Sequence, residues 1–260
     1  MTRLHTRLLG GFAVIAGLGL ALPAMAADIY VITTDNVMAA AREMQPKFEA
    51  ATGNKLTFRN QGALATFKLV EGGAASDVVV GSRLMLDKLL AEGKLKPGSI
   101  VDIAHSSLGV VVRQGQKAPS ISTDAKFKHL LLTVPSIAYP DPVKGSLGGN
   151  YFALLLKQWK LADKVNAKAQ LTPGGDATGH YVADGKAVIG INQIAEIREV
   201  PGLKFLTPLP PALVNKVTMS MAINVQAKQP KAAEQWIRWV ASAKGAGASK
   251  EHGMVPVHTR

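Results

Sequence analysis

Short apolar runs alternate with longer amphipathic stretches along most of the chain. Runs rich in β-branched residues predict buried strands near residues 29–32, 55–58, 77–80, 107–113, 136–139, 187–191 and 217–225, with a further strand beginning at 205. Apolar residues at helical spacing predict helices near 37–51, 63–71, 84–92, 123–132, 151–160, 193–198 and 230–243. The tail from residue 245 is expected to be mostly loop.

Strands that alternate with helices are typical of α/β proteins, in which helices cover both faces of a mostly parallel sheet. Polar loops fall into two groups, separated by the predicted strands at 107–113 and 217–225. We therefore predict two lobes, one from residues 27–108 with 218–260 and one from 109–217, with those two strands as the hinge. Ligands of open α/β sheets bind outside the carboxyl ends of the strands, so a small solute would lie in a cleft that closes around it.

The first predicted strand leads through a polar turn directly into a helix. Asp35 and Asn36 occupy that turn, and Val37 follows them. Free backbone N–H groups and the positive end of the helix dipole meet at such a point, which favours an anion. The Asn36 amide and the Val37 N–H are therefore candidate ligand contacts, although Asn36 would also serve as a simple helix cap. Asp35 in a closed cleft is a candidate general acid or base, unless it points outward or pairs with a lysine.

The N-terminus has the pattern of a cleavable export signal. Arg3 and Arg7 precede an apolar run at 8–22, and Ala24–Met25–Ala26 is an A-x-A cleavage site. We predict that residues 1–26 are removed after Ala26 and that the mature chain is periplasmic. An uncleaved membrane anchor is the alternative, which the short run and Pro23 disfavour.

Charge and composition exclude several classes of function. Two of the 30 basic residues lie in the leader, which leaves 28 against 18 acidic residues. The lysines are scattered and no basic helix with interleaved aromatic residues occurs, so nucleic acid is not an expected partner. The chain has no cysteine, no HExxH and no GxSxG, which leaves no thiolate site, no zinc-protease motif and no nucleophile elbow. We expect neither a metal nor a cofactor.

A second polar turn is predicted after the strand at 55–58. Asn60 and Gln61 offer amide donors there, and Gly62 permits a close approach of the backbone. Arg59 could pair with a carboxylate in bidentate fashion. The alternative for these residues is an ordinary turn with a surface arginine.

The loop at 140–150 is the leading candidate in the second lobe. Gly145, Ser146 and Gly148 place a hydroxyl and free N–H groups just before the predicted helix at 151–160. Lys144 would add positive charge or remain solvated. The glycine spacing is not that of a Walker A loop.

A second glycine-rich loop follows at 173–178. Gly174, Gly175 and Thr178 are its candidate ligand contacts. His180 lies just beyond and could shuttle a proton, although a lone histidine is more often structural.

Several segments carry a resemblance to a known family: FEAATG at 48–53, GAASDVVV at 73–80 and EGK at 92–94, together with the export signal and the first strand. With these segments the chain resembles the molybdate-binding-protein-like family of periplasmic solute receptors. The resemblance extends over nearly the whole mature chain. It implies a two-lobed periplasmic-binding-protein fold, a small anionic ligand and an ABC permease as partner, and we expect a monomer.

The chain departs from that family where the ligand would lie. Asn36 stands where molybdate receptors have a serine hydroxyl, residues 59–62 replace a serine-rich turn, and Gln193 replaces a late tyrosine. The resemblance makes Gln193 a candidate ligand contact. An ionised Asp35 would repel a dianion, which counts against molybdate.

Other segments are similar to a branch of the family that includes periplasmic aconitate isomerase. These are SSLGVVVR at 106–113, SIAY at 136–139, QIAE at 193–196, VPG at 200–202 and PLP at 208–210. The branch implies a di- or tricarboxylate ligand. Three functions remain open: a receptor for an ABC importer, an isomerase that moves an allylic proton with Asp35 or His180 as base, and a molybdate or tungstate receptor.

Overall fold

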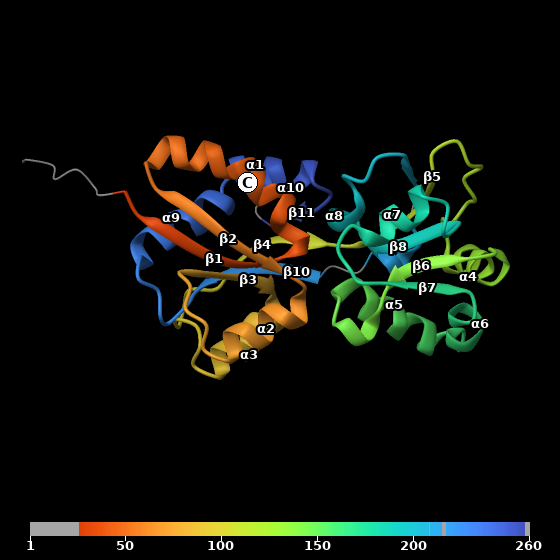
Figure 1. The fold of residues 1–260 in the computed structure, drawn as a ribbon, viewed down its shortest axis with the longest axis horizontal. Coiled ribbons are helices and arrows are strands. Elements are labelled where there is room, and N and C mark those ends of the chain that lie inside the picture. The colour runs from red at the N-terminus through yellow and green to blue at the C-terminus, as the bar shows by residue number, and fades with distance from the viewer. Residues whose placement is uncertain (1–25, 208, 215–216, 258–260) are drawn as a thin grey trace, which may run out of the picture.

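The computed structural model consists of two α/β lobes that lie side by side (Figure 1). It describes residues 26–257 except 208 and 215–216. The predicted two-lobed α/β fold is confirmed, and the predicted leader at 1–25 lies outside the described residues. No helix among the described residues is long and apolar enough to cross a membrane.

The first lobe contains a mixed sheet that combines strands from both ends of the chain (Figure 1). Its strands in spatial order are β11 (Val255–Pro256), β4 (Val101–Ser106), β10 (Val217–Ile223), β3 (Val78–Ser82), β1 (Asp28–Thr34) and β2 (Lys55–Gln61). The β1 strand pairs in parallel with β2 and β3, whereas β10 runs antiparallel to β3 and β4.

The second lobe is built on another mixed sheet. Its strands in spatial order are β7 (Ala169–Thr172), β6 (Ile137–Pro140), β8 (Ile189–Gln193), β5 (Leu108–Arg113) and β9 (Leu203–Phe205). The β6 strand is parallel to β7 and β8, and β5 is antiparallel to β8 and β9. The prediction of mostly parallel sheets was therefore wrong. The chain crosses between the lobes twice, and the first strand after each crossing, β5 or β10, runs antiparallel to both of its neighbours.

Helices cover both faces of each sheet because each sheet has an apolar surface on both sides (Figure 1). One face of the first sheet packs on α1 (Asp35–Thr52), α9 (Pro230–Val240) and α10 (Ala243–Glu251), and the other on α2 (Ala63–Glu71) and α3 (Arg83–Ala91). In the second lobe, α4 (Asp124–Thr133), α5 (Leu147–Gln158) and α6 (Ala162–Asn166) cover one face, and α7 (Ala177–Ala183) and α8 (Ile194–Ile197) the other. Short 3-10 turns lie at η1 (Pro142–Lys144) and η2 (Pro211–Leu213).

The start of α1 determines which residues follow the first strand at the cleft. It begins directly after β1, continues through Pro46 as one helix, and ends at Gly53, whose left-handed φ of 75° confirms it as the terminating glycine. Thr34 is the N-cap and its side chain makes no cap hydrogen bond. Asp35 and Asn36 are the first helical residues, not the caps that the sequence predicted.

Three other predictions were wrong in detail. The tail was expected to be loop but forms α10 and β11, because its small residues allow a helix to pack closely on α1. The loop at 140–150 is shorter than predicted, since η1 and the start of α5 lie within it. The strand β2 continues to Gln61, so Asn60 and Gln61 lie at a strand end and not in a turn.

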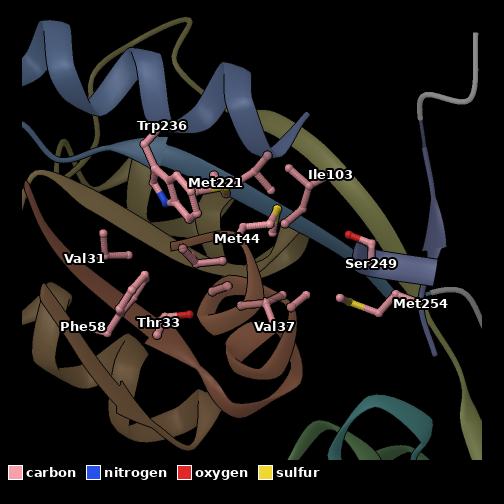
Figure 2. Close-up of a pocket in the computed structure, with 14 residues that line it drawn as sticks. Val31, Thr33, Val37, Met44, Phe58, Ile103, Met221, Trp236, Ser249 and Met254 are labelled. Carbon is pink, nitrogen blue, oxygen red and sulfur yellow. The ribbon is translucent and has the colours of Figure 1, made fainter. Parts of the chain in front are cut away.

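The core of the first lobe encloses a small apolar cavity (Figure 2). Its volume is about 20 Å³, and Met44, Ile103 and Trp236 are among its lining residues. Thr33 and Ser249 are its polar neighbours, and no charged side chain lines it among the described residues. This cavity is a packing void between the sheet and α1, α9 and α10, and it is separate from the space between the lobes.

Candidate functional site

A second, polar cavity lies between the two lobes. Its volume is about 30 Å³, which is room for about two water molecules. The lining residues come from turns on both lobes: Asp35, Asn36, Gly62, Ala63, Lys144, Ser146, Leu147, Pro173, Gly174, Gly175 and Glu196. Each turn follows the carboxyl end of a parallel strand, namely β1, β2, β6, β7 or β8, which is where open α/β sheets bind ligands.

Three helices point their N-termini toward this cavity: α1, α2 and α5. The first turn of a helix has N–H groups without intrahelical partners and carries partial positive charge. Neither α1 nor α2 has a side-chain cap, so the first-turn N–H groups of both stay free of a capping side chain. This arrangement suits an anion.

Asn36 adds an unpartnered donor to the same wall. The residue is 3% exposed, and its buried Nδ2 has no hydrogen-bond partner among the described residues. A buried donor without a partner costs about 1–3 kcal/mol. A ligand oxygen would remove that cost, so Asn36 is the polar side chain on α1 most suited to a ligand.

Asp35 lies beside it, held by the second strand. Asn60 Nδ2 donates to Asp35 Oδ1 at 2.7 Å. Burial raises the pKa of Asp35 above its ordinary value, the hydrogen bond from Asn60 opposes that shift, and the nearby Asp176 adds to it. The carboxylate therefore binds a proton more readily than an exposed aspartate does.

Glu196 on α8 supplies a second carboxyl group from the opposite lobe. Burial raises its pKa to about 8, the hydrogen bond from Asn192 opposes the shift, and the charge of Asp35 adds to it. Glu196 lines the cavity, and its carboxyl group is buried. A carboxyl with this pKa is mostly protonated at neutral pH.

Asn192 fixes the orientation of that carboxyl. Its Nδ2 donates to Glu196 Oε2 and to the Gly175 carbonyl, both at 2.8 Å. A Cβ atom on Gly148 would collide with Asn192 Oδ1. The predicted ligand contact Gly148 thus has a clear structural task, which is to leave room for Asn192.

The glycine-rich loops shape the second-lobe wall. Gly145, Gly174 and Gly175 all have positive φ, a backbone conformation that residues with a side chain adopt only with strain. Ser146 caps α5, accepting from the Gly149 N–H at 3.5 Å. Leu64 of the first lobe packs directly on Gly145, so the two lobes touch at this rim.

Other predicted residues lie outside the cavity lining. Val37 is buried in the first-lobe core, and Arg59 is exposed on β2. Gln61 is at the end of β2. The structure brings these three close to the turn but not into the cavity wall.

The remaining second-lobe candidates also lie apart from the wall. Thr178 is buried and its hydroxyl pairs with Thr172 at 2.7 Å. Gln193 is buried and accepts a hydrogen bond from Ser106 at the crossing between the lobes. His180 is exposed on α7, 3.5 Å from Asp176, and does not line the cavity.

Sequence reasoning missed Glu196 and Asn192. Their signal was an asparagine at the end of a buried strand, followed four residues later by a glutamate on the next helix, and the two side chains meet in the structure. No group of three or more histidine, aspartate or glutamate side chains in the described part of the chain is placed to hold a metal ion.

Comparison with known proteins identifies a relative of this chain. The chain is 31% identical over 233 residues to an aconitate isomerase from Pseudomonas sp, with 87% of each chain covered.

Solved structures share its fold. The sulfate-binding protein SubI from Mycobacterium tuberculosis H37Rv matches with a TM-score of 0.73 at 18% identity, over 90% of this chain and 88% of that one. The periplasmic molybdate-binding protein of Azotobacter vinelandii matches with a TM-score of 0.71 at 20% identity, over 87% of this chain and 98% of that one.

A family model described as bacterial extracellular solute-binding protein matches residues 29–255. That range includes both sheets and every turn that lines the cavity between the lobes. The chain therefore belongs to the bacterial extracellular solute-binding protein family.

Proposed function

We propose that this protein is a periplasmic isomerase of the aconitate isomerase type, which binds a small di- or tricarboxylate between its lobes and moves a proton along the allylic carbons. One observation carries the proposal: two carboxyl groups with raised pKa, Asp35 from one lobe and Glu196 from the other, reach the same cavity. A receptor for an anion has no need of such a pair. The similarity to an aconitate isomerase supports the choice of substrate class.

The anion donors of the cavity would hold the carboxylates of the substrate. The N-termini of α1, α2 and α5 offer backbone N–H groups, and Asn36 Nδ2 offers a donor without another partner. Lys144 lies on the cavity lining and adds a positive charge. Donors that strengthen their contacts as charge develops on the substrate also stabilise the transition state.

The carboxyl pair would carry the proton. A raised pKa makes the Asp35 carboxylate a stronger base, and the Glu196 carboxyl starts as an acid because its pKa is about 8. Asp35 takes a proton from a CH₂ group, the electron pair of the broken C–H bond forms a new C=C bond, and the far carbon of the old C=C bond takes the proton of Glu196. Exchange with water returns both carboxyl groups to their starting states.

Turnover of cis- and trans-aconitate, followed by ultraviolet absorbance, tests the proposal. Asp35→Asn and Glu196→Gln should each reduce kcat more than about 100-fold, because each removes one partner of the proton transfer. Affinity for aconitate should be kept or improved, because Asp35→Asn removes a negative charge and Glu196→Gln replaces a carboxyl group that is already mostly neutral. Glu71→Gln is the control, since Glu71 is exposed on α2 and should leave kcat unchanged.

Full turnover by either cavity variant would refute the role of that residue. A wild-type protein that binds aconitate in a thermal-shift assay without converting it would refute the isomerase.

A second candidate is a receptor that delivers a polycarboxylate to an ABC permease. Membership of the solute-binding family favours it. A thermal shift with molybdate or tungstate and none with tricarboxylates would instead favour an oxyanion receptor.

A further inference from the structure

His252 connects the two lobes through both of its ring nitrogens. It follows α10 in the first lobe, and its side chain is 18% exposed. Its Nε2 lies 3.1 Å from Glu43 Oε2 on α1, and its Nδ1 lies 3.0 Å from Glu199 Oε1, just after α8 in the second lobe. We call these three residues the His252 clamp.

The backbone at Gly253 places His252 against the second lobe. Gly253 has a left-handed φ of 79°, and a Cβ atom there would collide with Ile194 on α8. The corner at His252 and Gly253 therefore lies flat against the second lobe.

The clamp connects α1 to the segment just after α8, and these two helices carry the cavity carboxyl groups. Asp35 and Glu43 are both on α1, and Glu196 on α8 is three residues before Glu199. The α1, α8 and α10 helices lie next to one another where the lobes meet (Figure 1). Contacts at the clamp thus hold the two walls of the cavity at a fixed separation.

The protonation state of the imidazole decides how many clamp contacts form. A neutral imidazole has one N–H donor and one lone pair, so it donates to one carboxylate and turns a lone pair toward the other. An imidazolium ion donates to both carboxylates. Histidine is the side chain whose charge most readily changes between pH 5 and 8.

The other charged groups around the clamp do not remove the dependence of its contacts on the protonation of His252. Lys47 donates to the other oxygen of Glu43 at 2.6 Å. That hydrogen bond, with smaller contributions from His252, lowers the pKa of Glu43, so this carboxylate remains ionised at the pH values of interest. The negative charge of Glu251 on α10 attracts Lys47. Arg198 on the second lobe lies near Gly253 through its aliphatic chain.

Separation and closure of the lobes control access to the cavity. Its volume of about 30 Å³ is too small for a polycarboxylate, so the lobes must separate before any such ligand enters. We infer that protonation of His252 holds the lobes closed by bridging Glu43 and Glu199, so that closure is favoured at low pH and opening at high pH. This inference goes beyond the proposed function and does not depend on the identity of the ligand.

Spin labels on the two lobes test the inference without any ligand. The chain has no cysteine, so Lys68→Cys on α2 and Lys157→Cys on α5, both exposed, give one labelled pair. Distances measured by pulsed electron resonance at pH 5.5 and pH 8.5 report the closed and open populations. We expect the ratio of open to closed protein to rise about threefold at pH 8.5, the size typical of partly exposed charge pairs.

Three variants in the labelled protein separate the clamp from other titrating groups. His252→Gln and Glu199→Gln should each weaken the pH dependence of the distance distribution, and the part that remains comes from Glu196, whose pKa of about 8 also lies between the two pH values. His129→Gln, an exposed histidine on α4, should keep the wild-type pH dependence.

A wild-type distribution that does not change with pH would overturn the inference, as would His252→Gln with the wild-type response. Either result leaves the proposed isomerase untouched, because no substrate or turnover enters the measurement.

Discussion

Replacing Glu196 by glutamine would isolate the energetic cost of placing an ionisable carboxyl group between the lobes. The amide keeps the size and the polar character of the side chain but cannot ionise. Asn192 Nδ2, which donates to Glu196 Oε2 at 2.8 Å, can donate equally to the amide oxygen of glutamine. The variant should therefore fold with the same contacts.

The magnitude follows from the pKa of Glu196, which burial raises from 4.5 to about 8. At about 1.36 kcal/mol per pH unit, this difference corresponds to about 5 kcal/mol. The folded protein holds the proton more tightly than the unfolded chain, so this contribution to stability is complete below pH 4.5 and is lost as the pH rises to about 8. Separation of the lobes rehydrates the carboxylate without unfolding, which makes 5 kcal/mol an upper limit.

Urea unfolding at pH 5, 7 and 8.5, followed by tryptophan fluorescence, measures the effect. The variant should exceed the free energy of unfolding of the wild type by less than about 1 kcal/mol at pH 5 and by between about 1 and 5 kcal/mol at pH 8.5. Glu71→Gln, an exposed glutamate, should show no such trend. A difference between Glu196→Gln and the wild type that stays constant across this pH range would refute the reasoning.

Three further predictions concern single residues. Asp77→Ala should lower the free energy of unfolding by about 2–4 kcal/mol in urea, because the buried carboxylate accepts from the Tyr30 and Gln229 N–H groups at 2.8 and 2.7 Å. Asn36→Ala should weaken aconitate binding about tenfold in calorimetry with no loss of stability, since its Nδ2 has no partner among the described residues; equal affinity would show that the amide does not contact the ligand. Gly148→Ala should reduce aconitate turnover more than about tenfold through displacement of Asn192, and circular dichroism should show that the variant remains folded.

The positions of the cleft-lining turns could be predicted from the sequence because they depend on local patterns. Apolar runs predicted the strands near β1, β6 and β8, and polar residues at their ends marked the turns. Parallel strands carry their carboxyl ends to one edge of a sheet. Asp35, Asn36 and Ser146 therefore line the cavity, the first two as the first residues of α1 and Ser146 as the cap of α5. Their roles in binding or catalysis stay predictions.

The direction of the crossing strands was not determined by any local pattern. An antiparallel and a parallel central strand have the same apolar composition, so β5 and β10 could be oriented only by their neighbours. The helical tail was missed for a related reason: its small residues form a helix by packing on α1, a contact between the two ends of the chain.

The sequence by itself determined the α/β alternation, the family and the turns that line the cleft, because periodicity and turn chemistry act over a few residues. Only the tertiary structure decided which carboxyl groups share the cavity and which side chains bridge the lobes. In the sequence Glu196 is an ordinary helix residue, and its raised pKa comes from burial and from Asp35 in the folded protein. His252 is a histidine in the tail of the sequence, and only the fold places Glu43 and Glu199 on either side of it. Burial and charge proximity are properties of the folded arrangement, so the chemistry of this site is set where the two lobes meet.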